Sequence, residues 1–276
     1  MTTQEYFQPR SLDEAIDLLE AYSPEILVIA GGTIAVPLIN QGVSRPTKVM
    51  SLRRAGLDYI ARSNGGYAIG AATTLTSMVE QTAIPILSEA AHAVGGWSIR
   101  NMGTVGGNLF APPPAGDFAV ALLALDAILE VASKLDTESI SLDEFYIGFM
   151  SYDLAPDELV TEIYIPAPTG KTAYTKFGRR HANTPAVVTV AARVVEDGGK
   201  VEDARLALNA VGPHPMRAKR AEQALVGNRM DADTIQHVAR IAAEECEPFT
   251  DAIASADYRR RMVEVFVRRT LEKIAG

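Results

Sequence analysis

Cysteine is nearly absent from this sequence. Cys246 is the only one among 276 residues, so no disulfide can form within the chain. Because disulfides belong to oxidising compartments, we expect a reducing, cytoplasmic setting. An iron–sulfur cluster held by this chain alone is excluded in its usual form, since such a cluster needs about four thiolates.

Positive charge is also scarce. The chain has 26 Lys and Arg against 34 Asp and Glu, a formal net charge of −8. This balance argues against binding of nucleic acid through contacts to its phosphates. The one dense basic stretch, Arg259–Arg261 with Arg268 and Arg269, alternates with apolar residues at helical spacing. We interpret it as a solvated helix face or a subunit contact.

Metal-ligand spacings and long apolar runs are missing as well. The four histidines are scattered, without a pattern such as HExxH, so no metal site is predicted. The longest apolar run, Phe118–Leu125, falls far short of the ~20 residues that span a bilayer. The N-terminal MTTQEYFQPR carries no signal-peptide core. We expect a soluble protein without a membrane span.

Glycine, by contrast, is concentrated in two turns. One is AGGT at Ala30–Thr33, and the other is GTVGGN at Gly103–Asn108, followed closely by PAGD at Pro114–Asp117. Glycine tolerates positive φ and has no Cβ, so consecutive N–H groups can converge on an anion. Two such turns, each carrying a threonine, predict one diphosphate held from two sides.

The common nucleotide signatures do not fit these turns. Neither turn reads GxGxxG with an acid about twenty residues on, and neither reads GxxxxGK[ST]. No GxSxG elbow is present for a serine hydrolase. What remains is a backbone nest with hydroxyl support from Thr33 and Thr104, which suits a retained cofactor whose phosphates do not react.

Asp117 is the first acid after the second turn, and two interpretations of it stay open. Its carboxylate would repel phosphates, but it could accept hydrogen bonds from sugar or ribityl hydroxyls. It could equally be an N-cap for the helix that follows, since Asp is a favoured cap.

Periodicity predicts an α+β chain with three parts. Residues 1–54 read as a compact β–α–β unit, which includes a helix over 11–22 opened by a capping box. Residues 55–170 form a second unit, in which 142–149 is expected to be helical. The Pro- and Gly-bearing Pro166–Lys171 marks the boundary to 171–276, where three strands with a hairpin at Asp197–Gly199 precede a helical tail.

The motifs, taken in order, resemble a known family. AGGT, then RNMGTVGGNL at Arg100–Leu109, then PAGD with an apolar helix behind it, is similar to the FAD-binding medium subunit of molybdenum hydroxylases. That family includes the flavin subunits of carbon monoxide dehydrogenase and related dehydrogenases, and the flavin domain of xanthine dehydrogenase. Three further stretches agree, so the resemblance covers nearly the whole chain: Pro156–Ile165, Tyr174–Arg180 and Tyr258–Leu271.

The resemblance implies a fold and a set of FAD-binding residues. The expected fold is two α/β subdomains of the PCMH/VAO-like type that clasp FAD, followed by a C-terminal domain with a small antiparallel sheet and helices. The pyrophosphate and adenine side is expected to be lined by Val28, Ile29, Ala30, Gly31, Gly32, Thr33, Ile34 and Ala35. The opposite side of the pyrophosphate is assigned to Gly103, Thr104, Gly106, Gly107 and Asn108, with Phe110 and Ala111 beside them.

The remaining assignments concern the sugar and the flavin ring. Gly116 and Asp117 would meet the sugar or ribityl hydroxyls, and Leu159 and Val160 would pack beside the isoalloxazine. Lys176 would lie near the ring, where a cation stabilises negative charge on reduced flavin. The alternative for Lys176 is a solvated lysine on an edge strand. No residue of this chain is assigned a catalytic role of its own.

Some positions depart from the family pattern. Ile34 stands where relatives often have an acid, and Pro113 replaces a commonly seen serine. After Arg179 and Arg180 the chain reads HANTPA, where relatives often carry an acid and an aromatic residue at the outer face of the flavin. These changes weigh against NAD as the electron acceptor.

The function implied is that of an electron-transfer subunit. A large partner chain would hold the molybdenum cofactor, and a small partner would carry [2Fe–2S] clusters that pass electrons to FAD on this chain. The acceptor is NAD, a quinone, a carrier protein or oxygen, and the assembly is expected to be a dimer of heterotrimers. Two alternatives remain: a self-sufficient FAD-dependent oxidoreductase that acts on its own substrate, and a non-catalytic scaffold.

Overall fold

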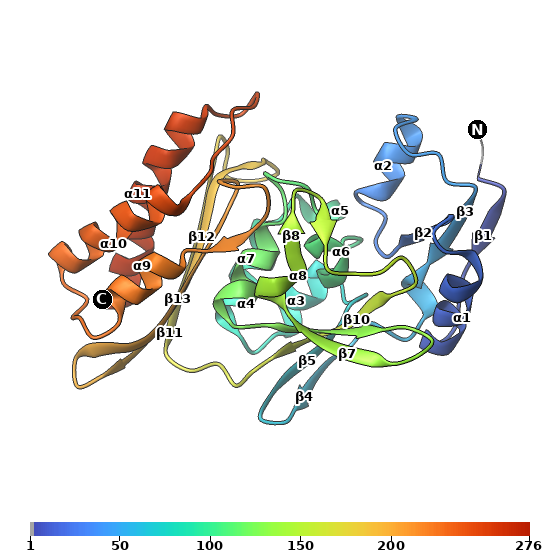
Figure 1. The fold of residues 1–276 in the computed structure, drawn as a ribbon, viewed down its shortest axis with the longest axis horizontal. Helices are drawn as coiled ribbons and strands as arrows, with labels where there is room; N and C mark the ends of the chain where they lie inside the picture. Colours follow the sequence, from blue (N-terminus) through green and yellow to red (C-terminus); the bar gives the residue numbers. More distant parts are fainter. Residues whose placement is uncertain (1–2) are drawn as a thin grey trace.

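The structure is a computed structural model that describes residues 3–276. Three sheets lie side by side along the long axis, with the N-terminal unit at one end and the C-terminal unit at the other (Figure 1). A fourth, two-stranded sheet is a small hairpin. None of the helices in residues 3–276 combines the length and the apolar character that crossing a membrane requires.

The N-terminal unit is a three-stranded parallel sheet in the order β1-β3-β2. Ser11 caps its first helix, because its side chain accepts a hydrogen bond from the N–H of Glu14. Parallel strands need crossover connections, and helices supply them here. The elements are β1 (Glu5–Phe7), α1 (Leu12–Tyr22), β2 (Ile26–Ile29), α2 (Ala35–Asn40), β3 (Lys48–Ser51) and a 3₁₀ turn at Leu52–Arg54.

The middle unit is a five-stranded antiparallel sheet in the order β4-β5-β10-β6-β7, with helices packed against it. Its elements are β4 (Ile60–Ser63), β5 (Gly66–Gly70), α3 (Leu75–Gln81), α4 (Pro85–Ala93), α5 (Trp97–Arg100), α6 (Val105–Leu109), α7 (Asp117–Ala124), β6 (Ile128–Ala132), β7 (Thr137–Ser141), α8 (Leu142–Phe145), β8 (Tyr146–Gly148), β9 (Ser151–Tyr152) and β10 (Leu159–Ile165).

The segment expected to be one helix over 142–149 is divided in two. The helix α8 ends at Phe145, and the chain turns into the β8–β9 hairpin. Aromatic packing favours the hairpin, because the ring of Tyr152 lies 5.4 Å from that of Phe145 and 4.9 Å from that of Phe110. Contacts between residues in different elements of the same chain leave no periodic signal in the local sequence.

The C-terminal unit is a four-stranded antiparallel sheet in the order β11-β12-β13-β14, covered on one face by three helices. The turn between β12 and β13 places Gly198 and Gly199 at φ of 56° and 75°, as a two-glycine hairpin requires. The elements are β11 (Lys171–Gly178), β12 (Ala186–Asp197), β13 (Lys200–Asn209), β14 (Met216–Arg217), α9 (Lys219–Leu225), α10 (Ala232–Glu245) and α11 (Ala256–Ala275). The predicted fold class is confirmed.

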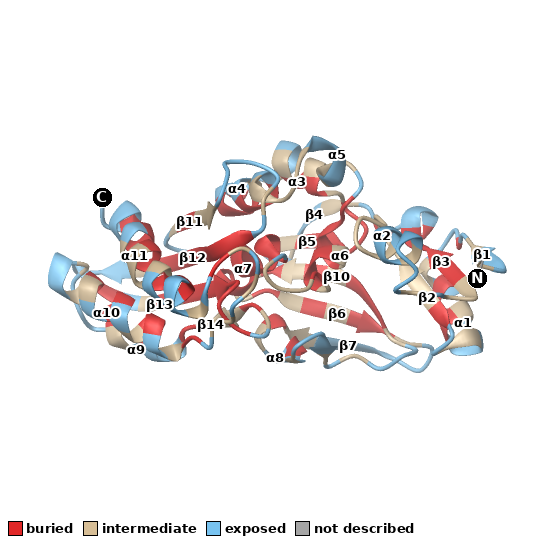
Figure 2. Ribbon diagram, turned by 90° about the horizontal axis from the view of Figure 1, so that it is seen from above, coloured by how far each residue is buried: buried red, intermediate tan, exposed pale blue. Residues whose placement is uncertain are grey.

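Helix α7 lies at the centre of the molecule and is buried along its whole length (Figure 2). The sheet of the C-terminal unit packs on it, and Ala191 of β12 and Ala207 of β13 join its core. The opposite face of the same sheet packs on α9, α10 and α11. Strand β12 is therefore buried on both faces, which explains why it reads as a continuous apolar run.

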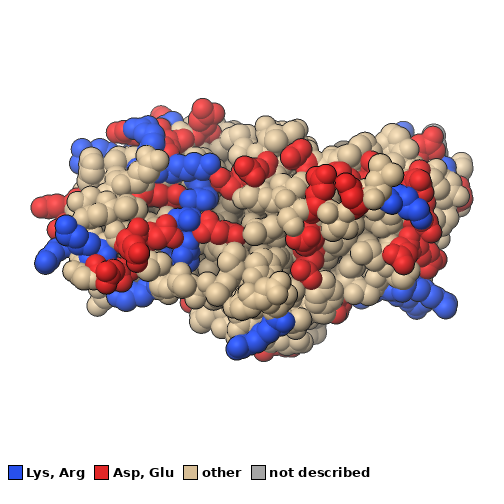
Figure 3. All heavy atoms as spheres, turned by 60° about the horizontal axis from the view of Figure 1, so that its bottom comes forward, with Lys and Arg blue, Asp and Glu red and all other residues tan. Residues whose placement is uncertain are grey.

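An arginine cluster holds the C-terminal end of α7. Asp126, just beyond the helix, forms ion pairs with Arg193, Arg205 and Arg217, and Arg193 Nε also donates to the carbonyl of Ala124 at 3.2 Å. Cations are favoured at this end because the helix dipole places negative charge there. Figure 3 shows basic side chains gathered where the C-terminal and middle units meet.

The basic stretch at 259–261 is only partly the solvated face that we expected. Arg259 is fully buried, and its Nη1 donates to the carbonyls of Ala186, Val187 and Ala210. Its Nη2 donates to both carboxylate oxygens of Asp251, at 2.8 and 2.9 Å. Helical spacing alone does not reveal this, because the carbonyl partners come from distant strand ends.

Replacing Arg259 by Met is expected to lower the free energy of unfolding by about 3–5 kcal/mol, because three carbonyls and a carboxylate lose their donor. Urea denaturation of the full chain measures the change. The control is Arg261→Met on the exposed face of the same helix, expected to stay within about 0.5 kcal/mol. Equal effects of the two substitutions would contradict a structural role for Arg259.

Candidate functional site

The first glycine turn connects β2 to α2. Gly32 has φ of +72°, a conformation that favours glycine. Within residues 3–276, the N–H groups of Gly32, Thr33 and Ile34 have no hydrogen-bond partner. These donors precede a helix N-terminus, where the backbone carries partial positive charge. The turn can therefore bind an anion.

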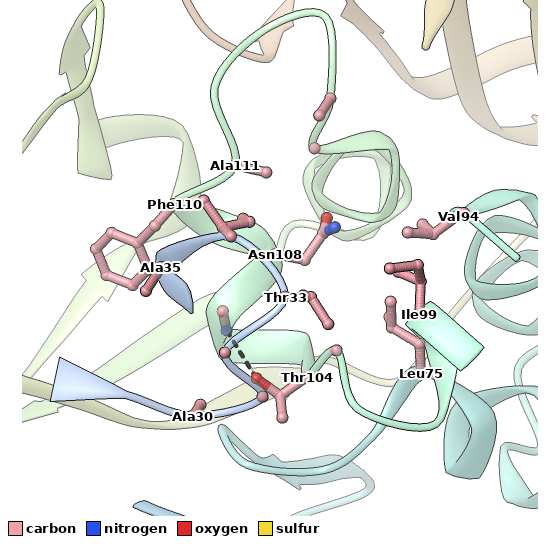
Figure 4. Close-up of a pocket in the computed structure, with 18 of the residues that line it drawn as sticks. Ala30, Thr33, Ala35, Leu75, Val94, Ile99, Thr104, Asn108, Phe110 and Ala111 are labelled. Carbon is pink, nitrogen blue, oxygen red and sulfur yellow. Dashed lines mark hydrogen bonds between the residues drawn. The ribbon is translucent and has the colours of Figure 1, made fainter. Parts of the chain in front are cut away.

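The second glycine turn opens α6, and most of its N–H groups are already paired. Thr104 is the N-cap, and its Oγ1 accepts from the N–H of Gly107 at 3.1 Å (Figure 4). The N–H groups of Val105 and Gly106 donate to Thr73 and Ala71. The donors left for a ligand are the Thr104 N–H and hydroxyl and the amide NH₂ of Asn108, whose Oδ1 accepts from Phe118. Side chains thus contribute more here than the glycine pattern predicts.

The two turns touch backbone to backbone. A Cβ on Gly31 would overlap the carbonyl oxygen of Met102 and lie 2.9 Å from Cα of Gly103. A Cβ on Gly103 would lie 3.5 Å from Oγ1 of Thr33. The absence of a side chain at Gly31 therefore lets segments far apart in the sequence form one site.

A cavity of about 550 Å³ lies at this junction. All but three of the residues expected to bind FAD line it, namely Val28, Ile29, Ala30, Gly31, Gly32, Thr33, Ile34, Ala35, Gly103, Thr104, Gly107, Asn108, Phe110, Ala111, Gly116, Asp117 and Lys176. Leu75, Val94 and Ile99, which no motif predicted, form an apolar wall of the cavity (Figure 4). Leu38 of α2 and the segment Asn183–Pro185 also line it. No motif marks these residues, because their shared position arises only from packing.

Three expected residues do not line the cavity. Leu159 and Val160 lie in the cores at the start of β10, which has a neighbouring strand on each side. A Cβ on Gly106 would lie 2.8 Å from both Cβ and O of Ala71. That glycine permits α6 to pack against the end of β5 and does not face the cavity.

A buried ion pair forms part of the cavity wall. Lys176 Nζ lies 2.8 Å from Oδ2 of Asp117 and donates to the carbonyl of Ala93, also at 2.8 Å. The hydroxyl of Thr189 donates to Oδ1 of Asp117 at 2.6 Å. Burial raises the pKa of Asp117, although Lys176 and Thr189 act in the opposite direction.

These contacts exclude one of the two alternatives for each of Lys176 and Asp117. Lys176 is largely buried, so it is not a solvated lysine on an edge strand. Gly116, at φ of +87°, is the N-cap of α7, and Asp117 is the first residue of the helix. Both carboxylate oxygens of Asp117 are held by donors within the chain.

The arrangement suits a ligand with an anionic centre and apolar, planar ends. Free N–H and hydroxyl donors converge from two sides at the junction, while Leu75, Val94, Ile99 and Phe110 provide apolar surface around it. Among residues 3–276, no group of three or more His, Cys, Asp or Glu could hold a metal ion. The free donors at the junction can hold an organic anion.

Comparisons with known proteins agree with this geometry. The model of the FAD binding domain in molybdopterin dehydrogenase matches residues 2–168, and that of the CO dehydrogenase flavoprotein C-terminal domain matches residues 172–274. The glyceraldehyde dehydrogenase medium chain of Sulfolobus acidocaldarius is 31% identical, with 98% of each chain covered.

Two further proteins are similar over nearly their whole length. The 6-hydroxypseudooxynicotine dehydrogenase complex subunit alpha of Paenarthrobacter nicotinovorans is 32% identical, with 98% of this chain and 93% of that one covered. A chain in the solved structure of carbon monoxide dehydrogenase from Hydrogenophaga pseudoflava superimposes with a TM-score of 0.94 at 28% identity. That match covers 99% of this chain and 97% of the other.

Replacing Gly31 by Ala is expected to lower the free energy of unfolding by about 1–3 kcal/mol, because the new Cβ forces the two turns apart. Urea denaturation measures the loss. The matched control is Gly96→Ala, where nothing lies within 4 Å of the new Cβ and φ is −110°. A tolerated Gly31→Ala would show that the turns do not need this close approach.

Replacing Lys176 by Met leaves Asp117 buried without its cation, so we expect a loss of about 3–5 kcal/mol near pH 8. The pKa of Asp117 then rises further above its unfolded value. A carboxyl group whose pKa is raised in the folded state destabilises the fold at high pH, where the unfolded chain ionises more readily. At low pH the group is protonated in both states and this destabilisation disappears. The free energy of unfolding of Lys176→Met should therefore approach that of the parent protein as the pH is lowered toward 5.

The double variant Lys176→Met with Asp117→Asn is the control for this prediction. It removes the buried charge as well as its partner, so its deficit should be smaller than that of Lys176→Met and independent of pH. Urea denaturation of all three proteins at pH 5 and pH 8 provides the comparison. A pH-independent deficit in Lys176→Met alone would contradict the coupling.

Proposed function

The chain belongs to the FAD-binding family of molybdopterin dehydrogenases, as its motifs predicted, and from this premise we propose that it relays electrons within a complex. It is a FAD-binding medium subunit of the molybdenum hydroxylase type. The observation that carries the proposal is the meeting of the two glycine turns over one cavity with unpaired donors.

The residues present fit FAD. A cavity of about 550 Å³ lies within the roughly 300–1,000 Å³ usual for small-molecule sites. The unpaired N–H groups of Gly32, Thr33 and Ile34 suit a diphosphate, and the free donors of Thr104 and Asn108 approach from the other turn. The apolar wall suits the flat, weakly polar ends of a dinucleotide.

In this proposal each part of the chain has a distinct task. The first turn and Thr104 bind the diphosphate, and Gly116 with Asp117 lies beside the sugar hydroxyls. Lys176 and Asp117 form part of the cavity wall, which excludes water and fixes the charge there. The bound flavin supplies the chemistry itself, the transfer of electrons from iron–sulfur clusters on a partner to an external acceptor.

The other redox centres are proposed to lie on partner chains. Cys246 is buried, and burial raises its pKa to about 12, so it is a poor metal ligand. We therefore assign [2Fe–2S] clusters to a small subunit and the molybdenum cofactor to a large one, in a dimer of heterotrimers in the cytoplasm. The similar proteins are named for glyceraldehyde, 6-hydroxypseudooxynicotine and carbon monoxide, which agrees with substrate choice on another chain.

The purified full chain is expected to show oxidised-flavin absorbance and no substrate oxidation alone. FAD at one hundred times its Kd should raise the free energy of unfolding by about 2.7 kcal/mol. Replacing Gly107 by Leu, on the cavity wall, should abolish retention of FAD through gel filtration. The control Gly96→Leu adds the same side chain outside this cavity.

Three outcomes would contradict parts of this proposal. Absence of flavin without any stabilisation by added FAD would sink the cofactor assignment. Full FAD occupancy in Gly107→Leu would refute binding at the two turns. Substrate turnover by the isolated chain would favour the self-sufficient oxidoreductase.

A further inference from the structure

A second cavity, of about 980 Å³, adjoins the first at the β11 edge of the C-terminal sheet. It lies between the edge strand β11 and the helices α4 and α5, and includes the loop that follows β11. Gly95, Lys176 and Thr184 line both cavities. One layer of residues therefore separates the second cavity from the proposed flavin site.

The second cavity is basic in a chain whose net charge is −8. Among the described residues that line it, Glu89 is the only acid, and the basic ones are His92, Arg100, Lys176, Arg179, Arg180, His181 and Lys273. Apart from Lys176, which pairs with Asp117, none of them forms an ion pair within the described chain. The positive charge is thus available to something outside the chain.

The surface around this charge has the composition of a protein interface. Trp97 on α5 is 72% exposed beside the cavity, and α5 has no buried residue. Trp and Arg are the residue types that protein interfaces favour. The segment between α4 and α5 is preorganised, because Arg100 Nη1 donates to the carbonyls of His92 and Val94, both at 3.2 Å. Preorganisation lowers the entropic cost of docking.

The cations do not converge on one point, as they would for a small phosphate. Lys273 Nζ donates to the carbonyl of Tyr174 and to Oγ1 of Thr175, and Arg180 Nη2 donates to the carbonyl of Asn183. Arg179 and His181 are exposed on the loop. Several exposed charges spread over different elements each contribute little, and they act together on a partner with many carboxylates.

We propose that this surface, made by Trp97, Arg100, Arg179–His181 and Lys273, docks an acidic electron-carrier protein. This inference rests on the proposed function, because the carrier takes the electrons that the bound cofactor gives up. The carrier is reduced by one electron in each encounter. Two carriers therefore remove the two electrons held by one reduced cofactor, which releases its two protons to solvent.

The test measures binding of two acidic probes, a plant-type ferredoxin and a flavodoxin, to the FAD-loaded full chain by surface plasmon resonance. The variant reverses charge at Arg179→Glu and Lys273→Glu, neither of which lines the flavin cavity. We expect the Kd for both probes to rise about tenfold, and binding of the parent protein to weaken with salt. The control is Arg240→Glu, an exposed arginine on α10.

Flavin absorbance and reduction of a small uncharged dye separate this inference from the proposed function. Both should be the same in the charge-reversal variant and in the parent. Absence of flavin from the parent would defeat the proposed function, whatever the probes do. Retained flavin with no binding of either probe, or with equal binding by the variant and by Arg240→Glu, would overturn the docking surface. A tight NAD complex that the charge reversal abolishes would overturn it in favour of a dinucleotide site.

Discussion

The burial of helix α7 is the constraint on which the rest of the structure depends. An apolar helix with no exposed face must be covered on every side, and helices α4 and α6 of the middle unit cover only part of it. The C-terminal sheet provides the missing cover through Ala191 and Ala207. That sheet is thereby fixed to the flavin-binding half by the hydrophobic effect.

Charged groups then set the position of the sheet along the helix. Asp117 meets Lys176 at the N-terminal end of α7, and Asp126 meets three arginines beyond its C-terminal end. Buried pairs contribute little net stability, but an unmatched charge there would be expensive. If the sheet slid by one residue along α7, the charged groups at both ends of the helix would lose their partners. The ion pairs therefore specify one register of the sheet on the helix. In that register Lys176 lies in the wall that the two cavities share. The C-terminal unit is therefore part of the site.

Glycines in the two turns have different physical roles that a motif does not separate. Gly31 permits one turn to touch the other, Gly106 permits α6 to pack on the middle sheet, and Gly107 faces the cavity. The motif therefore indicates which segments line the cavity, but it does not indicate what each glycine contacts. The sequence motif likewise does not indicate where the side chains of Leu159 and Val160 point. They pack in the hydrophobic cores, because β10 lies in the middle of its sheet.

The sequence by itself determined the fold class, the family and the segments that meet at the cavity. Glycine turns, helix caps and apolar periodicity involve residues that are close together in the sequence, so they can be recognised from the sequence alone. Only the tertiary structure decided that Lys176 pairs with Asp117, that Arg259 is buried, and that the apolar wall comes from 75, 94 and 99. Those facts depend on contacts between residues far apart in the chain, and burial changes what a side chain does without changing its identity.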